Sequence, residues 1–285
     1  MIFKSYMFKR VAIIGVGLMG GSLAMALRKK EMAKEIVGYS QRHATLVSAL
    51  KDKIIDEGVA EPALAVRNAD LIVLATPVQH ILAVLPVIAA QVKRGSMITD
   101  VGSTKGEIVE IAEKVFPAPG FFIGSHPLTG SEKRGLENAT PDLYQEALCL
   151  MTPTEKTNPV TKEKIKQMWA RVGCRVEMLK PEEHDGAMAY VSHLPHLLVF
   201  ALMGVMPSDY LKLAGPGLKD TTRIASSAPQ IWSDIFASNK RPLLQGLDET
   251  IKRLAEFRRA IIKKDEKTVL DFISQAKEKN DLWRK

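Results

Sequence analysis

The sequence predicts an α/β protein in which a doubly wound parallel sheet is followed by an all-helical region. Over residues 1–179, short apolar runs of strand length alternate with segments of helical periodicity, and a glycine-rich turn follows the first run. From residue 180 onward only helical segments remain. A chain of 285 residues can bury a core in each of two domains, so we expect a sheet domain at residues 1–179 and a helical domain at residues 180–285.

The first element is a strand at residues 11–14, whose continuous apolar run suits a strand buried on both faces. The turn Gly15-Val-Gly17-Leu-Met-Gly20 follows directly and leads into a helix over residues 22–27. In such a turn the first glycine permits the bend, the second lets the backbone approach a pyrophosphate, and the third lets helix and strand pack closely. The order of strand, turn and helix predicts a Rossmann-like dinucleotide site rather than a structural glycine turn. Its expected contacts are Gly15, Gly17, Leu18, Met19 and Gly20.

The later elements continue the alternation. Strands are expected at residues 35–39, 71–75, 97–100, 147–152 and 175–179. Helices are expected at residues 45–51, 77–92, 191–206 and 248–263, and residues 103–107 have the composition of a capped helix start. Because ligands bind beyond the carboxyl ends of parallel strands, Gly15, Thr76, Ser103 and His126 should lie at one edge of the sheet. Thr76 and Pro77 are expected to contact the cofactor there.

Composition argues against several functional classes. The formal net charge is +8, but the basic residues are dispersed and aromatic residues make up only 6%, so we expect no nucleic-acid partner. The surplus suits small anionic ligands or simple solubility. No apolar run approaches the roughly 20 residues of a membrane span and no signal peptide is evident, which predicts a cytoplasmic protein without membrane contact. Cys149 and Cys174 lack the spaced partners of a zinc site, so we expect buried thiols and no metal.

Four polar motifs stand where elements are expected to begin or end. They are Asp100-Val-Gly-Ser103-Thr-Lys105, Gly124-Ser-His126-Pro-Leu-Thr-Gly-Ser131-Glu132, His193-Leu-Pro-His196 and Lys219-Asp220-Thr-Thr-Arg223. A single histidine in a loop usually belongs to an ordinary polar turn and has no chemical role. Together with the glycine turn and Trp232, however, the four motifs resemble the prephenate and arogenate dehydrogenases of tyrosine biosynthesis, over residues 9 to about 257. The resemblance implies a dinucleotide-binding domain followed by a helical domain that forms a homodimer.

The implied reaction is oxidative decarboxylation of prephenate or arogenate with hydride transfer to NAD or NADP, and the motifs do not choose between the two substrates. By its place in the motif, His126 is implied to take the proton of the C4 hydroxyl, a task suited to a neutral imidazole. Ser103 is implied to bond that hydroxyl or the nicotinamide. Arg223 is implied to hold a substrate carboxylate, which a planar guanidinium binds better than an ammonium does.

The remaining motif residues are implied to line the substrate site. His196 would hold the substrate side chain, and Ser131 replaces the threonine that is common in the family. Glu132 and Asp220 would control access and orient Arg223, unless they are surface or capping carboxylates. His193 either contacts the ligand or packs at a helix start.

Other charged and basic side chains outside these roles receive simpler interpretations. Lys105 is expected to be a helix-start charge near the cofactor. His43, His80 and His184 have no partners at a suitable spacing, and we expect them on the surface.

The end of the second strand predicts the cofactor preference. NAD enzymes of this fold usually place an acidic residue there, about 20 residues after the glycine turn, to bond the ribose hydroxyls. This chain has Tyr39-Ser40-Gln-Arg42 instead. Ser40 would not repel an added phosphate and Arg42 could pair with it, unless Arg42 points into solvent. The sequence therefore favours NADP over NAD.

Two other functions fit the same fold. A beta-hydroxyacid dehydrogenase of the hydroxyisobutyrate type begins with a similar glycine turn, but it relies on a lysine in a long interdomain helix, and residues 191–206 contain none. A non-catalytic NAD(P)-sensing protein would leave His126 and Arg223 without a purpose.

Overall fold

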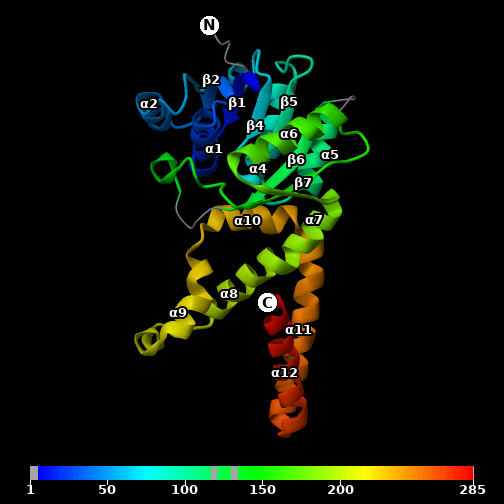
Figure 1. Cartoon of the computed structure of the whole chain (residues 1–285). Coiled ribbons are helices and arrows are strands. Elements are labelled where there is room, and N and C mark those ends of the chain that lie inside the picture. The colour runs from blue at the N-terminus through cyan, green and yellow to red at the C-terminus, as the bar shows by residue number, and fades with distance from the viewer. Residues whose placement is uncertain (1–5, 117–120, 130–133, 285) are drawn as a thin grey trace. The chain divides into compact units, whose positions relative to one another are not determined.

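The computed structural model describes residues 6–116, 121–129 and 134–284. By its internal contacts the chain divides into two compact units, residues 1–239 and residues 240–285. The first unit holds the sheet and the helices that follow it, and the second is a pair of helices (Figure 1).

The first unit is built on one eight-stranded sheet in the order β3-β2-β1-β4-β5-β6-β7-β8. The strands β3, β2, β1, β4, β5 and β6, which are neighbours in this order, are all parallel. Strand β7 is antiparallel to β6, and β8 is parallel to β7. The strands are β1 (Phe8–Ile14), β2 (Ala33–Tyr39), β3 (Glu57–Val59), β4 (Leu71–Leu74), β5 (Met97–Asp100), β6 (Phe122–Leu128), β7 (Leu148–Thr152) and β8 (Arg175–Met178). The strand order reverses between β1 and β4, which is where a doubly wound sheet binds its ligand. The predicted fold class is confirmed.

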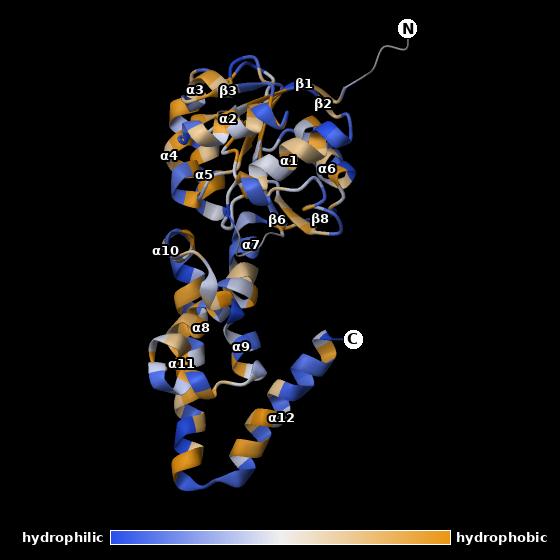
Figure 2. Ribbon diagram, turned by 90° about the vertical axis from the view of Figure 1, so that its left-hand side faces the viewer, coloured by the Kyte–Doolittle hydropathy of each residue, from blue (hydrophilic) through white to orange (hydrophobic). Residues whose placement is uncertain are grey.

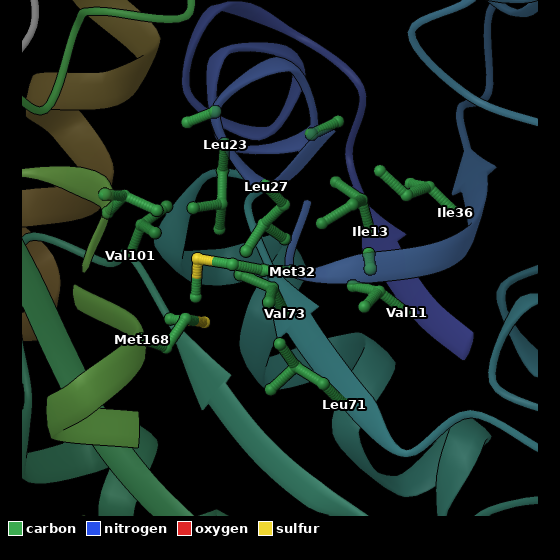
Figure 3. Close-up of a cluster of buried hydrophobic side chains, with 14 of the residues drawn as sticks. Val11, Ile13, Leu23, Leu27, Met32, Ile36, Leu71, Val73, Val101 and Met168 are labelled. Carbon is green, nitrogen blue, oxygen red and sulfur yellow. The ribbon is translucent and has the colours of Figure 1, made fainter. Parts of the chain in front are cut away.

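Helices cover both faces of this sheet. They are α1 (Leu18–Lys29), α2 (His43–Lys51), α3 (Pro62–Ala65), α4 (Val78–Ala89), α5 (Gly106–Val115) and α6 (Pro159–Val172). Alternate residues of β1 enter different cores, as the two-residue period of a strand requires. Val11 and Ile13 pack with α1, α2 and α6, whereas Ala12 and Ile14 pack with α3, α4 and α5. Figure 3 shows the first of these cores, with Leu23 and Leu27 of α1 above β1 and β4.

The chain leaves the sheet through one continuous helical run. It comprises α7 (Pro181–Met188), a π-helical turn at Ala189–His193 and α8 (Leu194–Gly204), so the expected helix at residues 191–206 begins earlier. The run is the one helix of the described residues that is long and apolar enough to cross a membrane, by length and composition alone. The expectation that no segment would reach that length was wrong. Only 28% of its most apolar 18-residue stretch is buried. Helix α8 therefore presents an uncovered apolar surface.

Shorter helices complete the first unit. They are the 3-10 turns Ser208–Leu213 and Arg223–Ser226, α9 (Pro216–Thr222) and α10 (Pro229–Ser238). Helix α10 packs against α4, and α7 packs against α5. These contacts tie the segment after residue 180 to the sheet.

The second unit consists of α11 (Lys240–Lys263) and α12 (Glu266–Trp283), which pack along each other through Phe257 and Phe272, with ring centroids 4.3 Å apart. Helix α11 begins eight residues before the expected start at Asp248, because Pro242 is tolerated in a first helical turn. Figure 2 shows hydrophobic residues recurring along both helices. Several of them are largely exposed: Ile251, Leu254, Ile261, Ile262, Leu270 and Ile273.

Candidate active site

The glycine turn has the shape that a pyrophosphate requires. Gly15 has a φ of +109°, and a Cβ there would lie 2.6 Å from the carbonyl oxygen of Ala75. A Cβ at Gly20 would collide with the Gly15 backbone, whereas one at Gly17 would meet nothing within 4 Å. Helix α1 begins at Leu18 directly after Gly17, and no side chain that the structure describes caps its first N–H groups. The turn therefore leaves open backbone and free donors where an anion can bind.

Thr76 adds a second feature that fits a bound dinucleotide. Its hydroxyl is buried without a hydrogen-bond partner among the described residues, and its methyl group lies against Gly15. Buried polar atoms are nearly always satisfied, so an orphaned hydroxyl beside the glycine turn indicates a partner supplied by a ligand. Pro77 follows at the exposed start of α4.

The residues at the end of β2 form a polar cluster with α4. Ser40 Oγ accepts a hydrogen bond from the backbone N–H of Arg42 at 3.1 Å, and the Arg42 side chain is exposed at the start of α2. The Gln41 amide lies 3.3 Å from His80 Nε2, and the His80 ring is stacked parallel to Tyr39. His80 was expected on the surface but is partly buried, and burial lowers its pKa.

His126 lies near the carboxyl end of β6 and is partly exposed. Its Nδ1 is 2.9 Å from Nε2 of His184, whose Nδ1 is 2.8 Å from the Asp185 carboxylate. The expectation that His184 lies on the surface was wrong, because it is fully buried between His126 and Asp185. Its partner is 58 residues away in the sequence, so no local spacing could reveal the contact.

Asp185 also binds the start of α5. Its two carboxylate oxygens accept the backbone N–H groups of Lys105 at 2.7 Å and Gly106 at 2.8 Å. The capped start was expected from Ser103, but Lys105 occupies the N-cap position and its side chain makes no cap, so Asp185 of α7 supplies it instead. Ser103 lies partly exposed in the loop just before α5.

Lys105 lies at the start of α5, as expected, but its charge is turned into the interior. It is fully buried and pairs with the buried Asp100 at the end of β5. Lys105 Nζ also donates to the Ser125 carbonyl at 3.0 Å, and Asp100 accepts the backbone N–H groups of Gly102 and Ser125. The pair therefore fastens the β5–α5 loop to β6, one residue before His126.

A second group of side chains comes from the π-helical turn, α8, and α10 with the residue that follows it. His193 is buried, and its Nδ1 lies 2.9 Å from the Asn239 amide, which also donates to the Asp185 carbonyl. Burial lowers the pKa of His193 to about 4. The His196 ring stacks on Trp232 with centroids 3.6 Å apart, and its Nδ1 lies 2.9 Å from the Ser192 carbonyl.

Two further substrate candidates lie near α9. Arg223 is exposed and close enough to His196 to help lower its pKa, after the larger effect of burial. Asp220 is exposed and lines an open hollow of about 560 Å³ together with Met203, Leu211 and Leu218. Ser131 and Glu132 lie outside the described residues.

The surroundings of His126 favour its neutral form. Burial lowers its pKa well below the ordinary range, and the charges of His184, Lys105 and His193 lower it further. A neutral imidazole held by a buried network at the ligand-binding edge can accept a proton from a bound molecule.

Comparisons with known proteins match almost the whole chain. The family model for the prephenate dehydrogenase nucleotide-binding domain matches residues 23–178, and the model for the prephenate dehydrogenase dimerization domain matches residues 180–275. Prephenate dehydrogenase of Bacillus subtilis is 34% identical over 95% of this chain and 75% of its own length. Cyclohexadienyl dehydrogenase of Zymomonas mobilis is 30% identical over 94% of each chain.

Solved structures agree. Prephenate dehydrogenase from Aquifex aeolicus, in complex with hydroxyphenyl propionate and NAD+, has a TM-score of 0.88 at 32% identity and covers 95% of this chain and 97% of its own. Synechocystis arogenate dehydrogenase has a TM-score of 0.81 at 28% identity, over 96% and 99% of the two chains. A 3-hydroxyisobutyrate dehydrogenase from Mycobacterium tuberculosis, at 12% identity, shares the fold alone. The chain belongs to the prephenate/arogenate (cyclohexadienyl) dehydrogenase family.

Proposed function

We propose that this chain catalyses the oxidative decarboxylation of prephenate or arogenate, with hydride transfer to NAD(P)+. Family membership supports the reaction class. The observation that carries the proposal is His126, a neutral imidazole at the ligand-binding edge of the sheet that is held by the buried chain through His184 to Asp185.

The substrate roles follow from the chemistry of the reaction. Prephenate bears a hydroxyl at C4 and a carboxylate at C1 of a cyclohexadiene ring. His126 takes the hydroxyl proton while hydride leaves C4, and the electrons of the bond to the C1 carboxylate enter the ring as carbon dioxide departs. Ser103 bonds the hydroxyl, and Arg223 holds a substrate carboxylate.

The other substrate contacts belong to the same proposal. His196 holds the substrate side chain from its stack on Trp232, and the His193 ring meets the same Trp232 edge-on. Asp220 orients Arg223. Ser131 and Glu132 keep the roles implied by their motif, at positions outside the described residues.

The cofactor site consists of the glycine turn with Leu18 and Met19, Thr76 and Pro77, and the end of β2. When bound, the nicotinamide accepts the hydride. The free N–H groups of α1 would hold the pyrophosphate, and the orphaned Thr76 hydroxyl would bond the cofactor. NAD+ is supported by the Aquifex complex.

A preference for NADP over NAD is a separate proposal, and it rests on Ser40 and Arg42 alone. It is tested by kcat/KM for both cofactors in the natural chain and in Arg42→Ala. A loss confined to NADP supports the role of Arg42. An advantage for NAD that is unchanged in the variant refutes it.

The domain roles and assembly complete the proposal. Residues 1–179 bind the dinucleotide, and residues 180–285 bind substrate and form a homodimer in the cytoplasm. The dimerization-domain match and the exposed apolar side chains of α8, α11 and α12 support the dimer.

The deciding experiment is a steady-state assay of the purified protein with prephenate and with arogenate, each with NAD+ and NADP+. The appearance of reduced nicotinamide is followed by its absorbance. Turnover of either ring substrate supports the function, and it also decides between the substrates. Cofactor binding without turnover of either would point instead to the sensing protein.

A further inference from the structure

The contacts of His126 and His184 determine which nitrogen of each ring carries a proton. His126 Nδ1 faces His184 Nε2 at 2.9 Å, and His184 Nδ1 faces the Asp185 carboxylate at 2.8 Å. In a neutral imidazole one nitrogen donates and the other accepts. Burial lowers the pKa of His184, which favours its neutral ring. Two neutral rings in a row therefore have only one consistent set of donors and acceptors, once the end of the row is fixed.

Asp185 fixes that end as an acceptor. Besides His184, it receives the backbone N–H groups of Lys105 and Gly106. Burial alone would raise the pKa of this carboxyl, but these three hydrogen bonds together keep it below its usual value. The carboxylate is thus ionised at neutral pH and has no proton to donate.

The remaining assignments follow in order. His184 donates from Nδ1 to the carboxylate, so its Nε2 carries a lone pair. His126 must then donate from Nδ1 to that lone pair. Its own Nε2 is left as a lone pair. The opposite arrangement would turn a bare His184 Nδ1 toward a buried carboxylate, which loses a charge-assisted bond and sets two acceptors against each other.

We propose that His184 and Asp185 are positioning residues that hold His126 in the Nδ1–H tautomer, so that Nε2 is the atom that accepts the substrate proton. The catalytic half of this inference rests on the proposed function. The tautomer itself does not.

The same contacts support the protonated state that follows. When His126 Nε2 takes a proton, Nδ1–H remains bonded to His184, and the Asp185 charge lies at the far side of that ring. The carboxylate also stays fixed, because the start of α5 holds both of its oxygens. The array resembles in logic a serine-protease triad, where an aspartate sets the tautomer of a histidine.

The direct test is ¹⁵N NMR of the full chain labelled at its six histidines, at about pH 8 where unshifted histidines are neutral. Long-range ¹H–¹⁵N correlations distinguish the two tautomers, and the His126 signals are assigned by their loss in His126→Gln. We expect Nδ1–H for His126 in the natural chain. An Nε2–H tautomer there overturns the proposal, whatever the enzyme activity.

Paired variants at position 184 test whether His184 causes the tautomer of His126. In His184→Gln, the amide can accept from His126 and donate to Asp185, so the tautomer should persist. In His184→Leu neither bond is possible, and the Nδ1–H tautomer should be lost or mixed. An unchanged tautomer in His184→Leu would overturn the role of His184.

Kinetics then connect the tautomer to catalysis. Asp185→Leu, which leaves the His184 Nδ1–H without its acceptor, should release the tautomer of both rings and lower kcat about 10²-fold or more while KM changes little. His184→Gln should retain much more of kcat than His184→Leu. The matched control is Glu110→Gln, which removes an exposed carboxylate paired with Lys114 and should leave kcat unchanged. Equal kcat in His184→Gln and His184→Leu, with both folded, would refute the positioning role.

If the natural chain turns over neither substrate, the proposed function fails and the NMR result still decides the tautomer.

Discussion

His126 and Arg223 are expected to contribute to catalysis in different ways. His126 is linked by hydrogen bonds to buried groups and has a lowered pKa, whereas Arg223 is exposed at the start of a 3-10 turn. A residue that acts on a proton in the transition state should affect kcat. A residue that binds a carboxylate in the ground state should affect KM.

Replacing His126 by asparagine should lower kcat by about 10²-fold or more, because an amide cannot take the proton that the proposed function assigns to the imidazole. In the natural chain, the lowered pKa means that His126 stays neutral as pH falls through the ordinary histidine range. kcat/KM should therefore hold through that range and decline only at lower pH. A pH profile of both proteins measures this, and near-normal turnover in His126→Asn would remove it from the mechanism.

Arg223→Lys should raise the KM for the ring substrate strongly, because an ammonium does not replace a bidentate guanidinium. The rise should correspond to a loss of roughly 2 kcal/mol or more of substrate-binding free energy. Cofactor affinity should be almost intact. Initial rates at varied substrate and varied cofactor separate the two effects. A defect confined to the cofactor would show that Arg223 has been assigned to the wrong ligand.

At the scale of elements, the buried pair of Lys105 and Asp100 joins β5, α5 and β6 beneath His126. Removing one partner of a buried pair leaves an unpaired charge in the interior, which costs about 3–5 kcal/mol. Such a loss is a large part of the stability of an ordinary domain.

Lys105→Met should therefore lower the free energy of unfolding by about 3 kcal/mol or more. Lys114→Met is the matched control on the same helix, because Lys114 is exposed and, in the described part of the chain, its ion pair is with the exposed Glu110. Its loss should cost under about 0.5 kcal/mol. Urea unfolding followed by circular dichroism measures both. Equal midpoints would mean that the buried pair does not stabilise the fold.

The elements that the sequence predicted are those with local patterns. The strand, glycine turn and helix at the start of the chain, and the strands at residues 71–75 and 97–100, agree with β1, α1, β4 and β5 to within a few residues. β3 was missed because it is three residues long and contains Glu57 and Gly58. The start of α7 was missed because residues 181–187 are mostly polar and have no apolar stripe.

The site was predicted less completely, for a related reason. His126 lies in a recognisable motif, whereas His184 and Asp185 obtain their roles only through contacts with residues about 60 to 80 positions away. Lys105 could be placed at a helix start from its neighbours, but its burial depends on β6, which no local spacing specifies.

At the scale of the whole molecule, the apolar side chains left exposed on α8, α11 and α12 are more than scattered surface residues. A family model named for dimerization matches this part of the chain. Burial of these side chains against a second copy would remove them from water.

Light scattering should therefore give the mass of a dimer at micromolar concentration. Ile262→Lys combined with Leu270→Lys, both exposed on the helical hairpin, should shift the protein toward monomer. Val87→Lys replaces a similarly exposed apolar residue on α4 and should leave the mass unchanged. A monomeric natural chain would contradict the assembly.

The reversal of direction between β6 and β7 affects how helix α1, and with it the proposed nucleotide site, is supported. A parallel crossover would carry the chain to the opposite end of the sheet, but an antiparallel return begins and ends at the ligand-binding edge. The part of this return that follows residue 134 lies along the first turns of α1. Leu136 packs on Gly21, the Thr140 N–H bonds Ser22 Oγ, and the Tyr144 hydroxyl bonds the Met19 carbonyl. The helix proposed to receive the pyrophosphate is thus braced from outside by a segment downstream of His126, so substitutions in that segment are expected to change cofactor affinity without altering the glycine turn.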